Sequence, residues 1–504
     1  MTDRVLISGG GPAGLMLAGE LALAGVNSVV LERRAEPATA SPGMAVHGRA
    51  LELLKRRALP EPIGPNDAFP WPLTPFALLW LNMEGAREVD YTYALPQWRT
   101  ERLLEAWVKS LGVDVRRGHE LISFTRNADG ITAQVQDERG VSYELTAGWL
   151  AGCDGAASRV RELAGIDFKE IAPTYYGVLG DFKPAEGEDR TFDAGLKANG
   201  MFGAIPLDAE TVRLMTIEFD VEAPAADTPV TKAELTARIE RITGAAPTIG
   251  EPTYLARFGA PTGLAAAFRD GRVLLVGDAA HSWFISGTQG LNAALQDAAN
   301  LGWKLAAAIR GTAPEDLLDT YDAERRPVAE AACHHADSTM ALLYPLERVE
   351  KLRNLITTLM GFDQVNRYLL EMPTAARYPL PASAPDGDGS HPLLGTAAPD
   401  AALEPIDAAA TAAAATTATT VSEAMRSGHG LLLDLSGGTA ELDAATGWSD
   451  RVDVVRAKPQ PDLPAAVLLL RPDGRIAYAD DAGTDAAALT ASLRTWFGES
   501  IAAG

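Results

Sequence analysis

Two glycine-rich segments, about 270 residues apart, carry residue types that can bind a nucleotide cofactor. The first, Gly9-Gly10-Gly11-Pro12-Ala13-Gly14, follows the apolar run Val5-Leu6-Ile7 and precedes a helical pattern. A glycine-rich turn between a strand and a helix is typical of dinucleotide sites, because unpaired N–H groups at the helix start bind a pyrophosphate. In this pattern Gly9 permits the tight turn, Gly11 lets phosphates approach the backbone, and Gly14 lets helix and strand pack closely.

An acidic residue stands where such a site needs one. A second apolar run, residues 28–31, ends in Glu32, 18 residues after Gly14. A carboxylate at this spacing accepts hydrogen bonds from an adenosine ribose. A tight turn without any ligand is the alternative for the glycines alone, and the flanking strand, the helix and Glu32 favour a dinucleotide site.

Two further segments add candidate chemistry. Residues 153–161 read Cys-Asp-Gly-Ala-Ala-Ser-Arg-Val-Arg and contain Asp154 and Arg161, although an Asp-Gly pair also forms a simple hairpin or helix cap. Gly277-Asp278 follows a buried-strand run, and glycines continue to Gly290-Leu291-Asn292, where a helix begins. Free N–H groups at that helix start can hold a ribityl oxygen, a phosphate or the anionic edge of a flavin ring.

Composition and charge limit the class of protein. The chain has 504 residues and a formal net charge of −23, so we expect more than one domain and neither a nucleic acid nor an anionic membrane as partner. The first strand begins by Val5 and no apolar run reaches a membrane-spanning length, which predicts a cytoplasmic protein. The cysteines are Cys153 and Cys333, and His334-His335 lack further ligands nearby, so we expect neither a disulfide framework nor a metal site.

The elements that must position these residues follow a mixed α/β pattern. An opening strand–helix–strand unit ends near residue 32, and helical patterns return at residues 49–54 and 101–107. Strand patterns that predict a meander follow at residues 113–116, 131–136 and 143–146. From about 170 to 265, alternating strands predict a separate antiparallel sheet, which would form a wall of a substrate cavity.

The second half of the chain continues with a long helical pattern over residues 291–343. Residues 408–420 are low in complexity and read as a surface loop. Strand patterns at 430–435 and 466–470 predict a small α/β unit, and the Asp-Gly pair within 471–475 predicts a hairpin after the second strand.

In this order and at these separations, the segments resemble the FAD-dependent aromatic hydroxylases, the single-component (class A) flavoprotein monooxygenases. The resemblance covers nearly the whole chain and is closest to the larger branch, which acts on aromatic polyketides and phenols. It implies an α/β fold with a GxGxxG Rossmann-like FAD-binding domain (residues 1–170 and 266–390) and an antiparallel-sheet substrate domain (171–265). It also implies a thioredoxin-like C-terminal domain (391–504), which has no cysteine and therefore no thiol exchange.

The resemblance implies a role for each motif. The GxGxxG residues would hold the ADP part of FAD, residues 154–161 would help to bind both FAD and NAD(P)H, and Gly277-Asp278 would contact the riboflavin part. The cofactor-binding residues implied in this way are Gly9, Gly11, Pro12, Ala13, Gly14, Glu32, Arg33, Arg49, Gln97, Asp154, Arg161, Gly277, Asp278, Gly290, Leu291 and Asn292. For Arg49 a solvated helix arginine, and for Gln97 an ordinary loop residue, are the alternatives.

One segment departs from the family pattern. Relatives carry two prolines and a Gly-Gly-Gln-Gly run after the GDAAH motif, whereas this chain has Phe284 and Ile285 in place of the prolines and Thr288 in place of a glycine. The change would reshape the substrate pocket, alter which atom is oxidised or impair oxygen activation; a neutral packing variation is the alternative. The aromatic pocket candidates are Trp283, Phe284, Phe202 and Phe219, each of which can equally be core.

The resemblance implies an enzyme that uses FAD, NAD(P)H and O2. NADPH or NADH would reduce the flavin, O2 would add at flavin C4a, and the hydroperoxide would deliver one oxygen atom to a polycyclic, polyketide-type phenol, so the protein itself needs no metal. Baeyer–Villiger oxidation of a ketone is the enzymatic alternative. A flavin-containing protein that binds aromatic ligands without oxygenase activity is the alternative of another class. The expected protein is a monomer or a homodimer.

Overall fold

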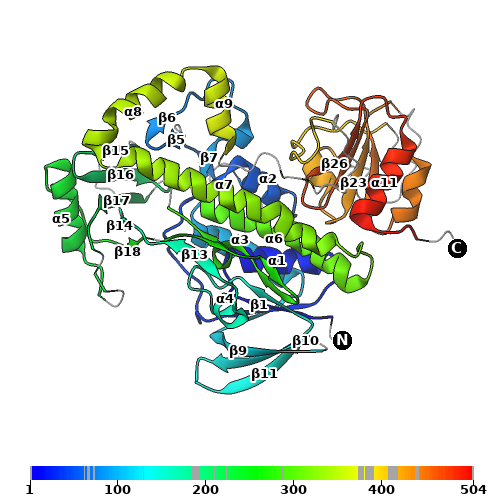
Figure 1. Cartoon of the computed structure of the whole chain (residues 1–504), viewed down its shortest axis with the longest axis horizontal. Coiled ribbons are helices and arrows are strands. Elements are labelled where there is room, and N and C mark those ends of the chain that lie inside the picture. Colours follow the sequence, from blue (N-terminus) through cyan, green and yellow to red (C-terminus); the bar gives the residue numbers. More distant parts are fainter. Residues whose placement is uncertain are drawn as a thin grey trace.

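The computed structural model describes residues 3–61, 63–64, 68–71, 74–128, 130–183, 192–208, 210–222, 224–225, 228–259, 261–284, 289–372, 378, 380, 391–406, 418–437 and 442–501. Within these ranges the chain forms a mixed α/β fold, with its main sheet at the centre and a C-terminal unit at one end (Figure 1).

The main sheet has six strands and is parallel except at one edge. In spatial order its strands are β20 (Arg269–Asp270), β21 (Val273–Leu275), β12 (Trp149–Gly152), β1 (Val5–Ser8), β2 (Ser28–Glu32) and β8 (Asp114–Arg117). Strands β1, β2 and β21 are apolar runs without polar alternation, and every residue in them is buried. Such runs are typical of parallel strands covered on both faces. The sheet therefore brings the carboxyl ends of its five parallel strands, β21, β12, β1, β2 and β8, to one edge.

Helices α1 (Pro12–Leu23), α3 (Gln97–Ser110), α6 (Gln289–Arg310) and α7 (Thr320–Leu343) pack around this sheet. Helix α1 lies against both α3 and α6, and ten of its residues are buried. The remaining helices among the described residues up to 372 are α2 (Gly48–Lys55), α4 (Arg159–Ala164), α5 (Lys232–Thr243), α8 (Leu346–Leu359) and α9 (Asp363–Glu371), with short 3-10 turns at η1 (Glu88–Asp90), η2 (Gly277–Ala279) and η4 (Leu317–Asp319).

A five-stranded antiparallel sheet lies at the opposite end of the molecule from the C-terminal unit (Figure 1). Its strands, in spatial order, are β15 (Asp193–Lys197), β16 (Gly200–Pro206), β17 (Val212–Phe219), β14 (Tyr175–Phe182) and β18 (Tyr254–Phe258). Helix α5 covers one face, with Leu235 and Ile239 buried against Val178. The antiparallel sheet expected between residues 170 and 265 is therefore present.

Smaller sheets complete this part of the chain. They are β13 (Phe168–Ile171) with β19 (Thr262–Ala265) and β22 (His281–Ser282), β3 (Ala45–His47) with β7 (Thr92–Ala94) and β4 (Phe69–Pro70), and the pair β5 (Pro75–Phe76) and β6 (Leu79–Trp80).

Two expected elements differ in the structure. The strand expected at 113–116 is β8, which pairs in parallel with β2 and not in the meander. The meander consists of β9 (His119–Asn127), β10 (Gly130–Asp137) and β11 (Ser142–Ala147); β9 lacks a clear apolar alternation, which hid it in the sequence. The long helical pattern over 291–343 is two helices, because Gly311 adopts a left-handed conformation (φ 70°) after α6.

The C-terminal unit is a four-stranded mixed sheet with flanking helices. Its strands lie in the order β24 (Val452–Arg456), β23 (Gly430–Asp434), β25 (Val467–Leu470) and β26 (Ile476–Asp480), and its helices are α10 (Val421–Ala424), η7 (Asp443–Trp448) and α11 (Ala486–Phe497). Strands β25 and β26 are antiparallel, and Gly474 between them has φ 77°, which confirms the hairpin expected at 471–475. Of the low-complexity segment 408–420, residues 408–417 lie outside the described residues.

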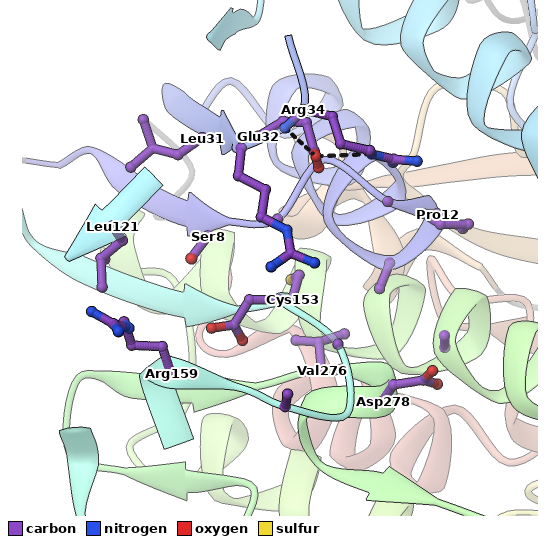
Figure 2. A pocket seen from close by; sticks show the side chains of 18 of the residues that line it. Ser8, Pro12, Leu31, Glu32, Arg34, Leu121, Cys153, Arg159, Val276 and Asp278 are labelled. Atoms are coloured by element: carbon purple, nitrogen blue, oxygen red, sulfur yellow. Dashed lines mark hydrogen bonds and ion pairs between the residues drawn. The ribbon is translucent and has the colours of Figure 1, made fainter. Parts of the chain in front are cut away.

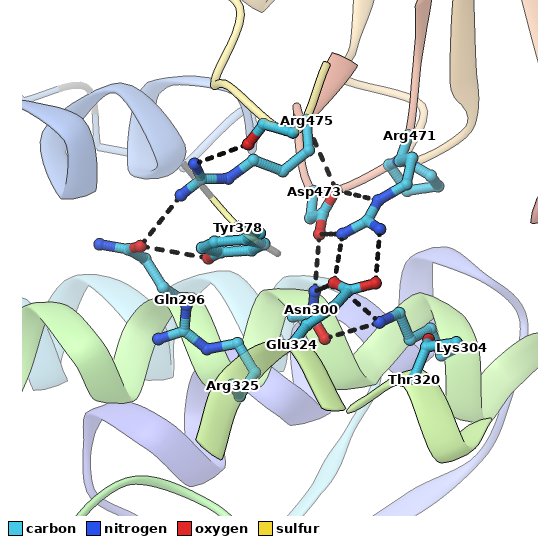
Figure 3. Close-up of polar contacts among 12 residues, drawn as sticks. Gln296, Asn300, Lys304, Thr320, Glu324, Arg325, Tyr378, Arg471, Asp473 and Arg475 are labelled. Atoms are coloured by element: carbon cyan, nitrogen blue, oxygen red, sulfur yellow. Dashed lines mark hydrogen bonds and ion pairs between the residues drawn. The ribbon is translucent and has the colours of Figure 1, made fainter. Parts of the chain in front are cut away.

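The hairpin 471–475 lies against helices α6 and α7 and carries buried charges (Figure 3). Arg471 donates both terminal guanidinium N–H groups to the Glu324 carboxylate of α7, each at 2.8 Å. Asp473 accepts from the side-chain amide of Asn300 of α6 at 2.9 Å. Lys304 Nζ lies 3.1 Å from Glu324, and its pKa is lowered to about 8, chiefly because burial disfavours the charged amine. The C-terminal unit is thus joined to the main body by a buried ionic network.

This network predicts a loss of stability in acid. Arg471, Lys304 and Arg475 face Asp473 and Glu324, and although burial opposes it, these cations hold the pKa of both carboxyls below their usual values of 3.8 and 4.5. The unfolded chain therefore binds more protons than the folded one below about pH 4.5, and stability falls as the pH drops through the lower native pKa values. Urea unfolding midpoints between pH 7 and pH 3 measure this loss.

The variant Glu324→Gln is the control for the acid prediction. It removes one of the two carboxyls of this network whose pKa is lowered, so its stability at pH 7 falls but its further loss in acid becomes smaller. An acid loss of the same size in the variant and the wild type would contradict the assignment. Glu20, which is paired with Arg57, has its pKa raised by burial, so it opposes the loss of stability in acid. It is present in both the wild type and the variant and does not affect their difference.

Candidate functional site

A cavity of about 600 Å³ opens at the carboxyl edge of the main sheet, where β1, β2, β12 and β21 end. Ligands of open α/β sheets bind at this edge. Figure 2 shows Leu121 and Arg159 at one end of the cavity, and Pro12 and Asp278 at the other. Ten of the expected cofactor residues line it: Gly9, Gly11, Pro12, Ala13, Glu32, Arg33, Gln97, Asp154, Asp278 and Leu291.

The two cavity-lining glycines of the first motif have different surroundings. Gly9 has φ 108°, and a Cβ atom there would lie 2.2 Å from the Cys153 carbonyl oxygen. A Cβ on Gly11, by contrast, would have no atom within 4 Å, since this residue faces the open cavity at the N-cap of α1. No side chain caps the helix there, so its first N–H groups are available to a ligand. Gly9 is thus required by the fold, and Gly11 leaves room for a bound group.

Glu32 lies at the end of β2 with its carboxylate held in place. Oε2 accepts from Gly10 N–H at 2.8 Å, and Oε1 accepts from the backbone and side chain of Arg34 at 2.9 and 3.0 Å. These bonds lower the pKa of Glu32 although burial opposes them. Arg34 also contacts Glu101 at 3.1 Å, and Glu101 accepts from the Gln97 amide at 2.9 Å. An ionised carboxylate therefore faces the cavity inside a fixed polar network.

Sequence reasoning missed Arg34 and Glu101 as parts of this network. Gln97 and Glu101 are four residues apart on α3, so they share a helix face, and that spacing was a usable signal. Other missed residues of the cavity wall are His119, Glu120, Arg159 and Glu162.

Asp154 shapes the segment that follows β12. Its carboxylate accepts from the Ser158 hydroxyl at 2.5 Å and from Val160 N–H at 3.0 Å, and Ser158 in turn caps α4. The capping role considered for the Asp-Gly pair is therefore present, and Asp154 also lines the cavity. Arg161 lies outside the cavity wall: it donates to the carbonyl oxygens of Ala279 and Ala156, both at 2.8 Å. It thereby ties this segment to the Gly277-Asp278 turn.

The turn after β21 presents Asp278 to the cavity. Its side chain is exposed to the cavity itself, whereas protein surrounds it on the other sides, and this burial raises the pKa of its carboxyl. Gly277 needs its positive φ of 62° to make the turn. A Cβ on Gly290 would lie 3.8 Å from Asp278 Oδ1, so the start of α6 is next to this carboxylate. The geometry suits a carboxylate that accepts hydrogen bonds from a polyhydroxyl chain.

We expect the variant Asp278→Ala to weaken FAD binding by about 1.5–3 kcal/mol, the usual contribution of a hydrogen bond to a charged group. Titration of the apoprotein with FAD measures the change, and Asp278→Asn, which keeps an acceptor oxygen, should lose less. Full flavin occupancy in Asp278→Ala at submicromolar concentrations would remove Asp278 from the site.

Sequence reasoning also missed Asp297, whose carboxylate hydrogen-bonds to the backbone of the Gly277-Asp278 turn. Asp297 is fully buried on α6 and accepts from Gly277 N–H at 3.2 Å. It pairs with Arg325 of α7 at 2.6 Å and with His281 Nε2 at 2.7 Å. Arg325 and His281 hold the pKa of this carboxyl low despite its burial.

The other expected cofactor residues lie outside the cavity wall. Gly14 allows α1 to approach the Gly9 carbonyl, and Asn292 accepts from His47 N–H at 2.7 Å, which joins α6 to β3. Arg49 on α2 lines a different cavity, of about 500 Å³, beside the C-terminal unit, and its pKa is lowered to about 10, mainly by burial. The structure therefore separates Arg49 from the residues expected around the phosphates, and its role stays a prediction.

A second, apolar cavity of about 110 Å³ lies between the five-stranded sheet and the main body. Phe202 and Phe284 line it, as expected. Trp283 instead stacks on the His281 ring (centroids 4.6 Å apart) and Phe219 on Tyr344 (4.8 Å), so both pack away from this wall. The atypical residues Ile285 and Thr288 lie outside the described residues. Other lining residues are Met44, Trp71, Trp80, Thr92, Phe192, Met201, Met215 and Thr339.

The described ranges contain no cluster of three or more His, Cys, Asp or Glu side chains that could hold a metal ion. In the same ranges, no helix is long and apolar enough to cross a membrane. The features of the 600 Å³ cavity fit a dinucleotide: an uncapped helix start, an open space at Gly11, and the carboxylates of Glu32 and Asp278 at separate places on its wall.

Comparisons with known proteins agree with this geometry. Residues 2–336 match the family described as "FAD binding domain", and residues 391–500 match "Aromatic-ring hydroxylase, C-terminal". The chain is 39% identical over 529 residues to 12-dehydrotetracycline 5-monooxygenase/anhydrotetracycline 6-monooxygenase of Streptomyces rimosus, covering 99% of each chain. It is 38% identical over 502 residues to dialkyldecalin synthase of Streptomyces rugosporus, again covering 99% of each.

Among solved structures, anhydrotetracycline hydroxylase from Streptomyces rimosus superposes with a TM-score of 0.86 at 37% identity, covering 99% of this chain and 100% of the other. Identity and coverage of this extent, together with the two matched families, establish the relationship over the whole chain. The protein belongs to the FAD-dependent aromatic-ring hydroxylases, monooxygenases with FAD as cofactor and NAD(P)H as co-substrate.

Proposed function

We propose that this monooxygenase hydroxylates a polycyclic, polyketide-type phenol. The observation that carries the proposal is the apolar cavity beside the flavin domain, whose wall combines Phe202, Phe284 and two tryptophans. Aromatic side chains of this kind suit a flat fused-ring ligand. The relative of Streptomyces rimosus is named for two tetracycline-type substrates, which supports the same substrate class.

The cavity must widen to accept such a ligand. Its volume of about 110 Å³ is below the several hundred Å³ typical of ligand pockets. Met44, Met201 and Met215 line it, and methionine side chains adapt readily to a new shape. We therefore expect substrate binding to rearrange these methionines and Phe202.

The cavity wall supports the following cofactor roles. Gly9, Gly11, Pro12, Ala13 and Gly14 form the turn for the ADP part, with Arg33 nearby, and Glu32 accepts from the ribose. Asp154 and Gln97 also line the cavity. Arg161 donates to the turn that carries Gly277 and Asp278. Asp278 and Leu291 line the riboflavin end, with Gly290 and Asn292 beside them at the start of α6. Bound FAD supplies the oxygen chemistry, while these residues bind and orient it and the apolar wall around Phe284 excludes water.

The same reasoning gives the division of the chain. Residues 1–170 and 266–390 form the Rossmann-like FAD-binding domain, and 171–265 the substrate domain. Residues 391–504 form a thioredoxin-like domain without a thiol pair, a proposal supported by the mixed order β24-β23-β25-β26 with α11 beside it. The protein acts in the cytoplasm, as a monomer or homodimer, on a small aromatic substrate.

Aerobic NADPH consumption by the FAD-loaded protein, with and without a panel of polycyclic phenols, tests the function. Strong stimulation by one class of phenol is expected. NMR of the product then separates hydroxylation, which gives a new phenol, from Baeyer–Villiger oxidation, which gives an ester or lactone. Absence of stimulation by every phenol would overturn the hydroxylase proposal.

A ring-forming reaction without net oxidation is the second candidate. It is favoured by the dialkyldecalin synthase, a relative with nearly the same identity as the tetracycline enzyme, and by a solved structure described as a Diels-Alderase (38% identity, TM-score 0.84), since a Diels–Alder reaction closes a ring without net oxidation. A linear polyene would then be converted to a product of unchanged mass without NADPH, a result that a hydroxylase does not give.

A further inference from the structure

The hairpin 471–475 reaches toward the flavin site through a chain of buried side chains. Its last residue, Arg475, places its guanidinium 3.5 Å from the centroid of the Tyr378 ring. The same ring lies 4.7 Å from the Arg325 guanidinium of α7. Figure 3 shows Tyr378 between the hairpin and the two helices. All three side chains are at most 3% exposed, so water screens these contacts little.

Helix α6 receives a second contact from the same residues. Gln296 Oε1 accepts from Arg475 at 3.2 Å and from the Tyr378 hydroxyl at 3.1 Å. The next residue in the chain is Asp297, so a contact that holds Gln296 in place also holds the Asp297 carboxylate against the Gly277-Asp278 turn.

Asp297 completes the connection. Arg325 Nε donates to its Oδ1 at 2.6 Å, while its Oδ2 accepts from Gly277 N–H and contacts His281. Gly277 is followed by Asp278, which lines the 600 Å³ cavity. Each link is thus a direct contact between buried groups, from the C-terminal unit to the cavity wall.

We propose that Arg475 and Tyr378 are positioning residues for the flavin site: through Arg325 and Asp297 they hold the Gly277-Asp278 turn in the geometry that FAD requires. The C-terminal unit then contributes to cofactor binding without touching the cofactor. A purely structural role for the hairpin would stabilise the fold but leave the FAD affinity of the folded protein unchanged.

Arg475→Met and Arg56→Met form a matched pair for the test. Both arginines are 3% exposed at the junction with the C-terminal unit, and Arg56 also packs beside Gly474 of the hairpin. Arg56, however, donates to the Ala398 carbonyl and pairs with Glu52, so it controls for a contact with the hairpin outside the Tyr378–Arg325–Asp297 chain. The FAD dissociation constant is measured by titrating apoprotein, and the flavin environment by visible circular dichroism of the loaded protein. We expect Arg475→Met to raise the dissociation constant about tenfold, about 1.4 kcal/mol, and to change the flavin spectrum. Arg56→Met should lower the melting temperature with neither effect.

Tyr378 supplies a second pair that does not depend on the first. Tyr378→Phe keeps the ring between the two guanidinium groups and loses only the hydroxyl contact to Gln296, which Arg475 still holds, so it should keep the wild-type flavin spectrum. Tyr378→Leu should behave like Arg475→Met. If Arg475→Met fails to fold, this pair decides by the same readouts. Wild-type FAD affinity and flavin spectrum in Tyr378→Leu, or equal losses in Arg475→Met and Arg56→Met, would overturn the proposal.

Discussion

The variant Gly11→Ala will fold normally and lose affinity for FAD. Gly11 has an ordinary φ of −79°, and its new Cβ would meet no protein atom within 4 Å, so the apoprotein keeps its stability to within about 1 kcal/mol. The methyl group would instead occupy the space next to the first N–H groups of α1, where the proposed phosphates lie. Overpacking of this kind costs about 1–3 kcal/mol, or roughly 5- to 150-fold in dissociation constant.

Gly9→Ala is the matched comparison, two residues away in the same turn. Its Cβ would lie 2.2 Å from a backbone oxygen of Cys153, and its φ of 108° is strained for alanine. Backbone strain and overpacking cost about 1–3 kcal/mol each, so Gly9→Ala lowers the free energy of unfolding of the apoprotein. Thermal unfolding of both apoproteins and FAD titration of the folded variant separate the two outcomes. Equal destabilisation by both substitutions, or unimpaired FAD binding by Gly11→Ala, would contradict the assignment of Gly11.

Removing the Arg471 guanidinium will destabilise the whole protein. Arg471 is fully buried and pairs with both Glu324 and Asp473, so Arg471→Met leaves these two buried carboxylates without their paired guanidinium, with Lys304 and Arg475 as the cations still nearby. Breaking a buried ion pair in this way costs about 3–5 kcal/mol. Urea unfolding at pH 7, followed by the fluorescence of Trp303 and Trp496, measures the loss, because both rings lie beside Arg471.

Lys458→Met is the control for this experiment. Lys458 forms an ion pair with Glu404 at 2.9 Å, but both side chains are mostly exposed. Exposed pairs of this kind contribute little to stability, so its unfolding curve should coincide with that of the wild type. An Arg471→Met curve that also coincides would show that the buried network is not needed for the fold.

The parts of the site encoded in consecutive residues could be predicted from the sequence. The turn from Gly9 to Gly14 was visible because its backbone needs glycine at fixed spacings, and Glu32 because it ends the next strand. The hairpin around Gly474 was visible for the same reason, since a left-handed residue in a tight turn favours glycine. Each of these signals is local.

The contacts between distant segments could not be predicted. Asp297 is one acidic residue inside a helix, and its partner Arg325 is 28 residues away on another helix. No pattern in the residues around Asp297 indicates that its carboxylate will be buried against the Gly277-Asp278 turn. The position of Arg49 could not be predicted either. Its helix was expected from the sequence, but its position beside the C-terminal unit depends on tertiary packing.

The order of synthesis gives the hairpin a further consequence. Arg471 is made 147 residues after Glu324, which at about 5–20 residues per second takes roughly 7 to 30 seconds. Until then, Glu324 of α7 has Lys304 of α6 as a partner but lacks Arg471, so a chain interrupted before residue 471 contains every flavin motif without the complete buried network. We therefore expect nascent chains of this enzyme to become competent for the cofactor only near the end of translation, and premature termination late in the message to yield substrates for proteolysis instead of a smaller flavoprotein.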